Sequence, residues 1–175
     1  MTTPKNNYQQ GERVIYPNHG ICVIEEIKEE TIGGIQDTFY NVRVLESGSS
    51  LFIPSSNLET VGLRSPIKKS EVKKIFGRID NGDIKVYSKW KNRYEENLKM
   101  MCTGTLEDLV DVLKSLFFVA KKKTLSFREK KMQERALELL SGEIAHSLDD
   151  NREEVEKRLI SSFEKAVENF QIEEE

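Results

Sequence analysis

The sequence has few of the residues on which catalytic and metal sites are most often built. Its 175 residues include two histidines, two cysteines and one tryptophan. It contains no phosphate-binding glycine-rich loop and no nucleophile-elbow motif. His19 and Cys22 are spaced like two metal ligands, but no second pair completes a tetrahedral site. We therefore predict no enzyme activity, no catalytic residue, no metal and no cofactor, and interpret His19 as a turn residue.

Long apolar runs are also missing. The longest, Leu116–Ala120, has five residues, whereas a membrane-spanning helix needs about 20. The first residues include no apolar segment of the kind found in secretory signals. The two cysteines lie far apart in unrelated contexts, so we expect both to be reduced, small, buried residues. These absences predict a cytoplasmic protein that has no membrane partner.

The net charge of −3 conceals a strong asymmetry along the chain. Residues 1–67 have a net charge of −3, and residues 136–175 have a net charge of −8. Residues 68–135 carry 18 basic and 10 acidic residues, a net charge of +8. Such a block within an acidic protein indicates a surface that binds a polyanion. The alternative is that these cations lie on solvated helix faces and pair with the acids of the last segment.

The first third of the chain has the pattern of short β-strands separated by turns. The apolar runs predict strands at Arg13–Tyr16, Ile21–Ile27, Phe39–Val44 and Leu51–Pro54. Residues 58–63 could add a fifth strand, and residues 1–9 are polar and expected to be disordered. So few short strands cannot form a sandwich but can form a small barrel. Pro54 is typical of an edge strand, which a partner protein could extend.

After Pro66 the apolar period changes from 2 to 3.6, which predicts helices. Five amphipathic segments follow, running from Val72 to Ile79, Trp90 to Met101, Leu106 to Ala120, Met132 to Leu148 and Val155 to Phe170. Thr105 and Asp108, like Ser126 and Glu129, have the spacing of a capping box. We therefore predict an α+β fold, with a small β-barrel in residues 1–66 and an all-α bundle of about five helices in residues 67–175.

The helix that contains the only tryptophan is the candidate binding element. Ser88 can cap it, and its apolar stripe consists of Trp90, Tyr94, Leu98 and Met101. The neighbouring cations are Lys85, Lys89, Lys91 and Arg93. One hypothesis makes Trp90 the first core residue of the helix. The other exposes it as an apolar wedge for a nucleic-acid groove, while the cations bind phosphates. The pattern alone leaves both open.

Several stretches of this sequence are similar to one known family. They are Gly11–Gly20 (GERVIYPNHG), Ile32–Gln36, Phe52–Pro54, Val61–Gly62, Trp90–Leu98, Leu125–Met132 and Ala136–Glu143. In this order, over about residues 8–148, they resemble the CarD/CdnL family of bacterial transcription regulators. The first stretch, joined to the tryptophan helix, makes the resemblance specific.

The resemblance implies a Tudor-like barrel that docks on the β subunit of RNA polymerase by extending a sheet. We expect this contact at Glu30, Arg43, Phe52, Ile53 and Pro54, although relatives can present arginines at the positions of Glu30 and Phe52. The resemblance also implies that the helical domain binds promoter DNA at the upstream edge of the melted region. There the tryptophan would enter the minor groove and slow closing of the bubble, and the phosphate contacts would be Lys85, Lys89, Lys91 and Arg93.

Two alternatives remain beside this hypothesis. The first is a protein–protein adaptor, in which Trp90 is buried and the chain makes no direct contact with DNA. The second is a sequence-specific repressor that acts without polymerase. No helix with Arg, Asn and Gln at recognition spacing supports the repressor. A monomer is the default expectation.

Overall fold

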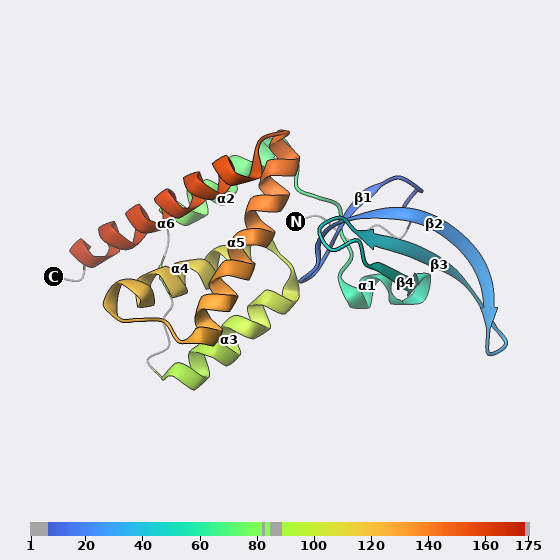
Figure 1. Cartoon of the computed structure of the whole chain (residues 1–175), viewed down its shortest axis with the longest axis horizontal. Coiled ribbons are helices and arrows are strands. Elements are labelled where there is room, and N and C mark those ends of the chain that lie inside the picture. The colour runs from blue at the N-terminus through green and yellow to red at the C-terminus, as the bar shows by residue number, and fades with distance from the viewer. Residues whose placement is uncertain (1–6, 82, 85–88, 174–175) are drawn as a thin grey trace. The chain divides into compact units, whose positions relative to one another are not determined.

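The computed structural model describes residues 7–81, 83–84 and 89–173, which fall into two compact units (Figure 1). Unit 1 is Met1–Pro66 and unit 2 is Ile67–Glu175. The first unit is a curled sheet and the second consists of helices. The predicted fold class, a Tudor-like β unit followed by a helical unit, is confirmed.

Unit 1 is built on a four-stranded antiparallel sheet in the order β1-β2-β3-β4. The strands are β1 (Arg13–Tyr16), β2 (Gly20–Ile32), β3 (Ile35–Val44) and β4 (Ser50–Pro54). Alternate side chains face inward, as the period of two requires, and form a core that includes Val14, Cys22, Ile24, Tyr40, Val42 and Ile53. A 3₁₀ turn, η1 (Ser55–Asn57), follows the last strand.

The β2–β3 hairpin is longer than the sequence pattern predicts. Its two strands stay paired as far as Ile32 and Ile35, so only Gly33 and Gly34 form the turn. Both glycines have positive φ angles, 61° and 83°. A two-residue turn with this geometry matches the twist of the flanking strands and strongly favours glycine.

Residues 58–63 do not form the fifth strand that we predicted. Leu58–Val61 is a short helix, α1, which ends at Gly62 with a φ angle of 73°. The apolar residues Leu58 and Val61 are three apart, which suits a helical turn better than a strand. Arg64 instead pairs with Ile15, and its carbonyl oxygen accepts a hydrogen bond from the Ile15 N–H at 2.7 Å.

Tyr8 is buried in the core of unit 1, and its hydroxyl group donates to the carbonyl oxygen of Leu63 at 2.9 Å. Its ring lies edge-on to that of Tyr40. The expectation that residues 1–9 are disordered is therefore wrong at Tyr8, while residues 1–6 lie outside the described part of the chain.

Within its described residues, unit 2 contains five α-helices and one short 3₁₀ turn. They are η2 (Lys69–Glu71), α2 (Val72–Asp80), α3 (Trp90–Thr103), α4 (Leu106–Lys122), α5 (Phe127–Leu148) and α6 (Arg152–Glu173). The apolar stripes of α4, α5 and α6 meet in one core, whose fully buried members include Val110, Leu113, Leu116, Leu140, Ile144, Leu159 and Phe163. In the described residues, no helix combines the length and apolarity needed to cross a lipid bilayer.

Two helix starts confirm the predicted capping signals. The Thr105 hydroxyl oxygen accepts from the Asp108 N–H at 3.2 Å. The Ser126 hydroxyl oxygen accepts from the Glu129 N–H at 3.3 Å, and the Glu129 carboxylate accepts from the Ser126 N–H at 2.9 Å. The N-cap of α3 is Lys89, which makes no side-chain capping bond. The predicted cap, Ser88, lies outside the described residues.

Candidate docking edge and nucleic-acid interface

The candidate docking edge of unit 1 is the edge strand β4, Ser50–Pro54. Among the described strands it pairs with β3 alone, so its other side is free to accept a further strand. Phe52 is 64% exposed on this edge. Ile53 is buried in the core, so only its backbone can reach a partner, and Pro54 ends the strand. A partner strand added here would gain main-chain hydrogen bonds, with Phe52 as a side-chain contact.

The other two residues of the expected polymerase contact lie on β2 and β3. Arg43 is half-buried on β3, and its guanidinium group is ion-paired with Glu25. Arg43 faces Ser50 in the sheet register, so it lies beside the docking edge. Glu30 is exposed farther out on the β2–β3 hairpin, opposite Asp37. The structure therefore gathers four of the five expected residues at β3–β4 and separates Glu30 from them.

In unit 2, the start of α3 is held by a buried ion pair. Arg93 is 1% exposed and Glu129 is 2% exposed. The Nε atom of Arg93 donates to Oε1 of Glu129 at 2.9 Å, and Nη2 donates to the same oxygen. This contact joins the first turn of α3 to the first turn of α5, so the starts of these helices lie together (Figure 1).

The Glu129 carboxylate also caps α5, and its two functions shift its pKa. Burial by itself raises the pKa of this carboxyl group. Hydrogen bonds from the Ser126 backbone, the Arg93 guanidinium group and the Ser126 hydroxyl group stabilise the charged form and outweigh burial. The pKa of Glu129 therefore lies below its usual value, and this carboxyl group is ionised at neutral pH.

The predicted apolar stripe of α3 is wrong at Leu98. Among its described side chains, α3 buries Arg93, Asn97 and Met101, spaced four apart, whereas Leu98 is 45% exposed. The inward face is partly polar because the Glu129 carboxylate lies there and requires a cationic partner. Local periodicity cannot detect such a partner, since Glu129 is 36 residues away along the chain.

The expected phosphate contacts divide into three groups. Lys89 and Lys91 are exposed, and no carboxylate pairs with either among the described residues. Arg93 is buried and paired, so its expected phosphate contact conflicts with this placement, and we correct its role to holding α3 against α5. Lys85 lies outside the described residues, as does the side chain of Trp90, the first residue of α3.

Further cations gather at the same end of unit 2. Lys123 lies just after α4, and Arg128 and Lys130 lie in the first turn of α5. All three are exposed, and none has a carboxylate partner in the described part of the chain. Arg128 lies over the ring of Tyr94, 5.9 Å from its centroid, which brings it against α3. We call the set of Lys89, Lys91, Lys123, Arg128 and Lys130 the cationic face.

Several other cations of unit 2 are neutralised locally. Examples are the pairs Lys99–Glu96, Lys131–Glu134 and Lys157–Glu154, each between residues three apart on one helix. Lys121 pairs at 3.8 Å with Glu168 in the acidic last segment, as the alternative interpretation of the charge block expects. That interpretation does not account for the cationic face, because its five members have no such partners in the described residues.

One prominent exposed side chain is not among the site residues predicted from the sequence. Phe127, the first residue of α5, is 76% exposed. It precedes Glu129 by two residues, so it lies at the junction of α3 and α5. The available signal was its position outside the apolar stripe of α5, which begins only at Met132.

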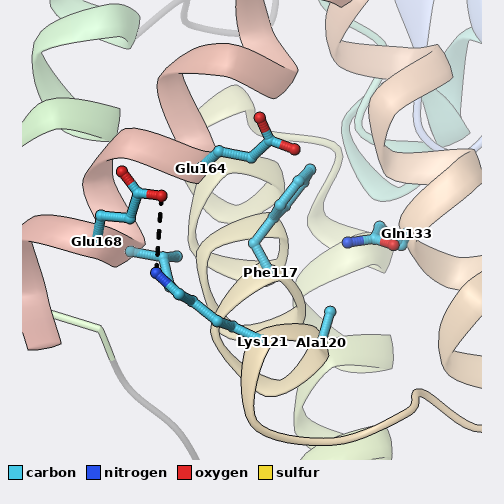
Figure 2. A pocket seen from close by; sticks show the side chains of 7 residues that line it. Phe117, Ala120, Lys121, Gln133, Glu164 and Glu168 are labelled. Carbon is cyan, nitrogen blue, oxygen red and sulfur yellow. Dashed lines mark ion pairs between the residues drawn. The ribbon is translucent and has the colours of Figure 1, made fainter.

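A groove of about 520 Å³ lies between α4, α5 and α6 (Figure 2). Its lining includes the apolar residues Phe117, Ala120 and Val167 and the charged residues Lys121, Glu164 and Glu168. No lining residue carries a hydroxyl, thiol or imidazole group, so a nucleophile activated by a histidine base cannot be built there. Nowhere in the described residues do three or more His, Cys, Asp or Glu side chains gather as they would around a metal ion.

Comparison with known proteins gives a consistent result for both units. The model of the CarD-like/TRCF RID domain matches residues 8–67, and the model of the CarD C-terminal domain matches residues 74–160. The chain is also similar to a protein of Bacillus subtilis (strain 168) named "Putative transcription factor YdeB". The two are 29% identical over 137 residues, which is 78% of this chain and 90% of the relative.

Proposed function

Because the chain belongs to the CarD family of transcription factors, we propose that it binds RNA polymerase through unit 1 and stabilises the open promoter complex through unit 2. The partner of unit 1 is the β subunit of the polymerase. The partner of unit 2 is promoter DNA at the upstream edge of the melted region. The protein acts as a monomer and without enzymatic activity or a cofactor.

The matched domain and the free strand edge support the polymerase half of this proposal. A CarD-like/TRCF RID domain implies interaction with RNA polymerase. In this chain β4 offers an unpaired edge with an exposed Phe52, which suits strand addition. Arg43 lies beside that edge and can exchange its partner Glu25 for a group on the polymerase. Glu30 lies two register positions beyond the last β3–β4 pair, on β2, and would touch the polymerase beside the β4 contact.

The cationic face is the observation that carries the DNA half. Five exposed cations without acidic partners in the described residues lie near the starts of α3 and α5, on a protein whose net charge is −3. Five phosphate contacts would give a plot of log affinity against log salt a slope of about −4.5. Lys85, together with Lys89 and Lys91, completes the phosphate contacts that the family resemblance implies. Arg93 takes no part in them and fixes α3 in place.

In this proposal Trp90 is the wedge at the bubble edge. Unstacking one base step costs a few kcal/mol, so a wedge that offsets about 1.4 kcal/mol of this cost changes the ratio of open to closed complexes about tenfold. Binding to free DNA is weak, because the contacts are few and the junction exists only on polymerase.

The decisive experiment measures the lifetime of the open complex on a promoter of the same organism with its own polymerase. Wild type should prolong that lifetime, and Trp90→Ala should lose most of the gain. Lys131→Met is the matched control, because Lys131 is already paired with Glu134. An unchanged lifetime with wild-type protein that still binds the β subunit would refute the DNA half and favour an adaptor without DNA contact.

The docking half has its own variant. Phe52→Ser should weaken binding to the isolated β subunit about 10- to 100-fold, the equivalent of removing one buried phenyl contact. The control is Ile35→Ser, which removes a somewhat more exposed apolar residue, 72% accessible, from the tip of the hairpin. Equal weakening by both variants would show that β4 is not the docking edge.

A further inference from the structure

Among the described residues, Phe127 is the most exposed large apolar side chain. It occupies the first position of α5, where side chains point back toward the helix N-terminus and therefore beyond the end of the helix. Leu125, on the other side of the cap residue, is buried and makes the apolar contact with the core. The fold thus has no packing use for the phenyl ring.

Three exposed cations flank Phe127 along the chain. Lys123 precedes it by four residues, and Arg128 and Lys130 follow it in the first turn of α5. None of the three is neutralised by a carboxylate among the described residues. An exposed aromatic ring on an acidic or neutral surface would suit a protein partner. A ring among unpaired cations has the composition of a site that binds a nucleic-acid backbone and stacks on its bases.

The ion pair between Arg93 and Glu129 places this ring beside the start of α3. Trp90 is three residues before Arg93, a rise of about 4.5 Å along the helix axis. Phe127 is two residues before Glu129. The two aromatic residues therefore precede the two partners of one buried contact, each by less than one helical turn. A nucleic acid that reaches the start of α3 also reaches the start of α5.

We infer that Phe127 is a second DNA contact of unit 2, which stacks on an unpaired base at the edge of the melted region while Lys123, Arg128 and Lys130 bind the adjacent phosphates. This inference rests on the proposed function and adds single-stranded DNA to its partners. The stacked base must be unpaired and unstacked, because in a duplex both faces of each base are covered by its neighbours. Base–aromatic stacking of this kind corresponds to about 5- to 150-fold in affinity per base.

Three variants of the full-length chain test the inference on polymerase–promoter open complexes. Phe127→Ser removes the ring, and Phe127→Tyr retains it. Leu98→Ser removes another exposed apolar side chain of unit 2, from the part of α3 beyond its first two turns. Phe127→Ser should reduce the increase in open-complex lifetime that the protein causes about fivefold or more, and the other two variants should behave as wild type. Circular dichroism should show the same helix content for all of them, since both side chains are exposed.

A photocrosslinking residue, p-benzoylphenylalanine, at position 127 identifies the partner directly. The expected product is a crosslink to a nucleotide of the melted strands near the upstream edge. Crosslinks confined to polymerase or to paired DNA would overturn the inference. The inference would also be overturned if Phe127→Ser gave the same open-complex lifetime as wild type while Trp90→Ala lost most of the added lifetime. The proposed function would then stand without this contact. If the wild-type chain itself fails to prolong the lifetime, the proposed function fails, and this inference with it.

Discussion

Replacing Arg93 by methionine should destabilise unit 2 by about 3–5 kcal/mol, which is the usual cost of breaking a buried ion pair from one side. The side chains of Arg93 and Glu129 are 2% and 3% exposed, so water cannot replace the lost partner. Methionine fills much of the volume of the arginine stem. The cost therefore comes from the carboxylate that is left buried and charged, and not from a cavity.

The bonds of Glu129 show how a second substitution should relieve this cost. Arg93 occupies Oε1, while Oε2 accepts from the Ser126 N–H at 2.9 Å and from the Ser126 hydroxyl group at 2.8 Å. Glu129→Gln removes the charge but keeps an amide oxygen that can cap Ser126. The double variant Arg93→Met/Glu129→Gln should therefore recover about 2 kcal/mol or more relative to Arg93→Met alone.

Urea unfolding followed by far-ultraviolet circular dichroism is the suitable assay, because unit 2 contains the long helices. Lys131→Met is the matched control on α5, since its pair with Glu134 is exposed and should contribute about 0–1 kcal/mol. The reasoning is refuted if Arg93→Met lies within the range of this control, or if the two substitutions of the double variant are additive.

The pH dependence of unfolding gives an independent check on the same pair. The pKa of Glu129 is lowered from 4.5 in the folded chain, so the unfolded chain binds the proton more tightly. The stability that this carboxylate contributes is therefore complete above about pH 4.5 and is lost as the pH falls through the folded pKa. In Arg93→Met the guanidinium group is gone and burial opposes the charge. The difference in stability between Arg93→Met and wild type should shrink as the pH falls toward the pKa of the unfolded carboxyl group.

Two further predictions concern unit 1. Burial raises the pKa of the Cys22 thiol to about 11. At about pH 8 a thiol reagent should therefore modify the exposed Cys102 quickly and Cys22 only after unfolding. Rapid modification of both thiols in the native chain would contradict this. Gly62→Ala should cost more than the about 1–2 kcal/mol of a left-handed alanine, because its Cβ atom would lie 3.2 Å from Cγ of Pro17. Gly48→Ala, with a similar φ angle and open space, should cost only the backbone strain, and equal losses in urea unfolding would refute the contact.

Local signals were sufficient for much of the fold. β1 occupies the predicted residues, and the N-cap residues Thr105 and Ser126, the second in a full capping box, mark the observed helix starts. These features depend on residues a few positions apart, which a sequence displays directly. The length of the β2–β3 hairpin was missed because its outer part is exposed on both faces and carries no apolar alternation.

The features that sequence could not supply depend on partners far along the chain. Tyr8 lies in a polar segment and is buried by its bond to Leu63, 55 residues away. Cys102 was expected to be buried but is exposed, because α3 turns a partly polar face inward. A helical wheel orders residues by angle alone, and it places Asn97 and Leu98 only 100° apart. The ion pair between Arg93 and Glu129 fixes the rotation of α3 and so decides which of the two faces the core.

The same pair corrects how the charge block should be interpreted. Arg93 contributes to the +8 of residues 68–135 but is neutralised inside the fold, whereas Arg128 and Lys130 face solvent without acidic partners in the described residues. The double variant Arg93→Met/Glu129→Gln removes one charge of each sign. If Arg93 only positions α3, the salt dependence of binding to a short duplex should keep its slope in that variant. Lys91→Met should reduce the slope by about 0.9, the effect of one lost phosphate contact. An equal reduction in the double variant would mean that Arg93 leaves its buried site to bind DNA.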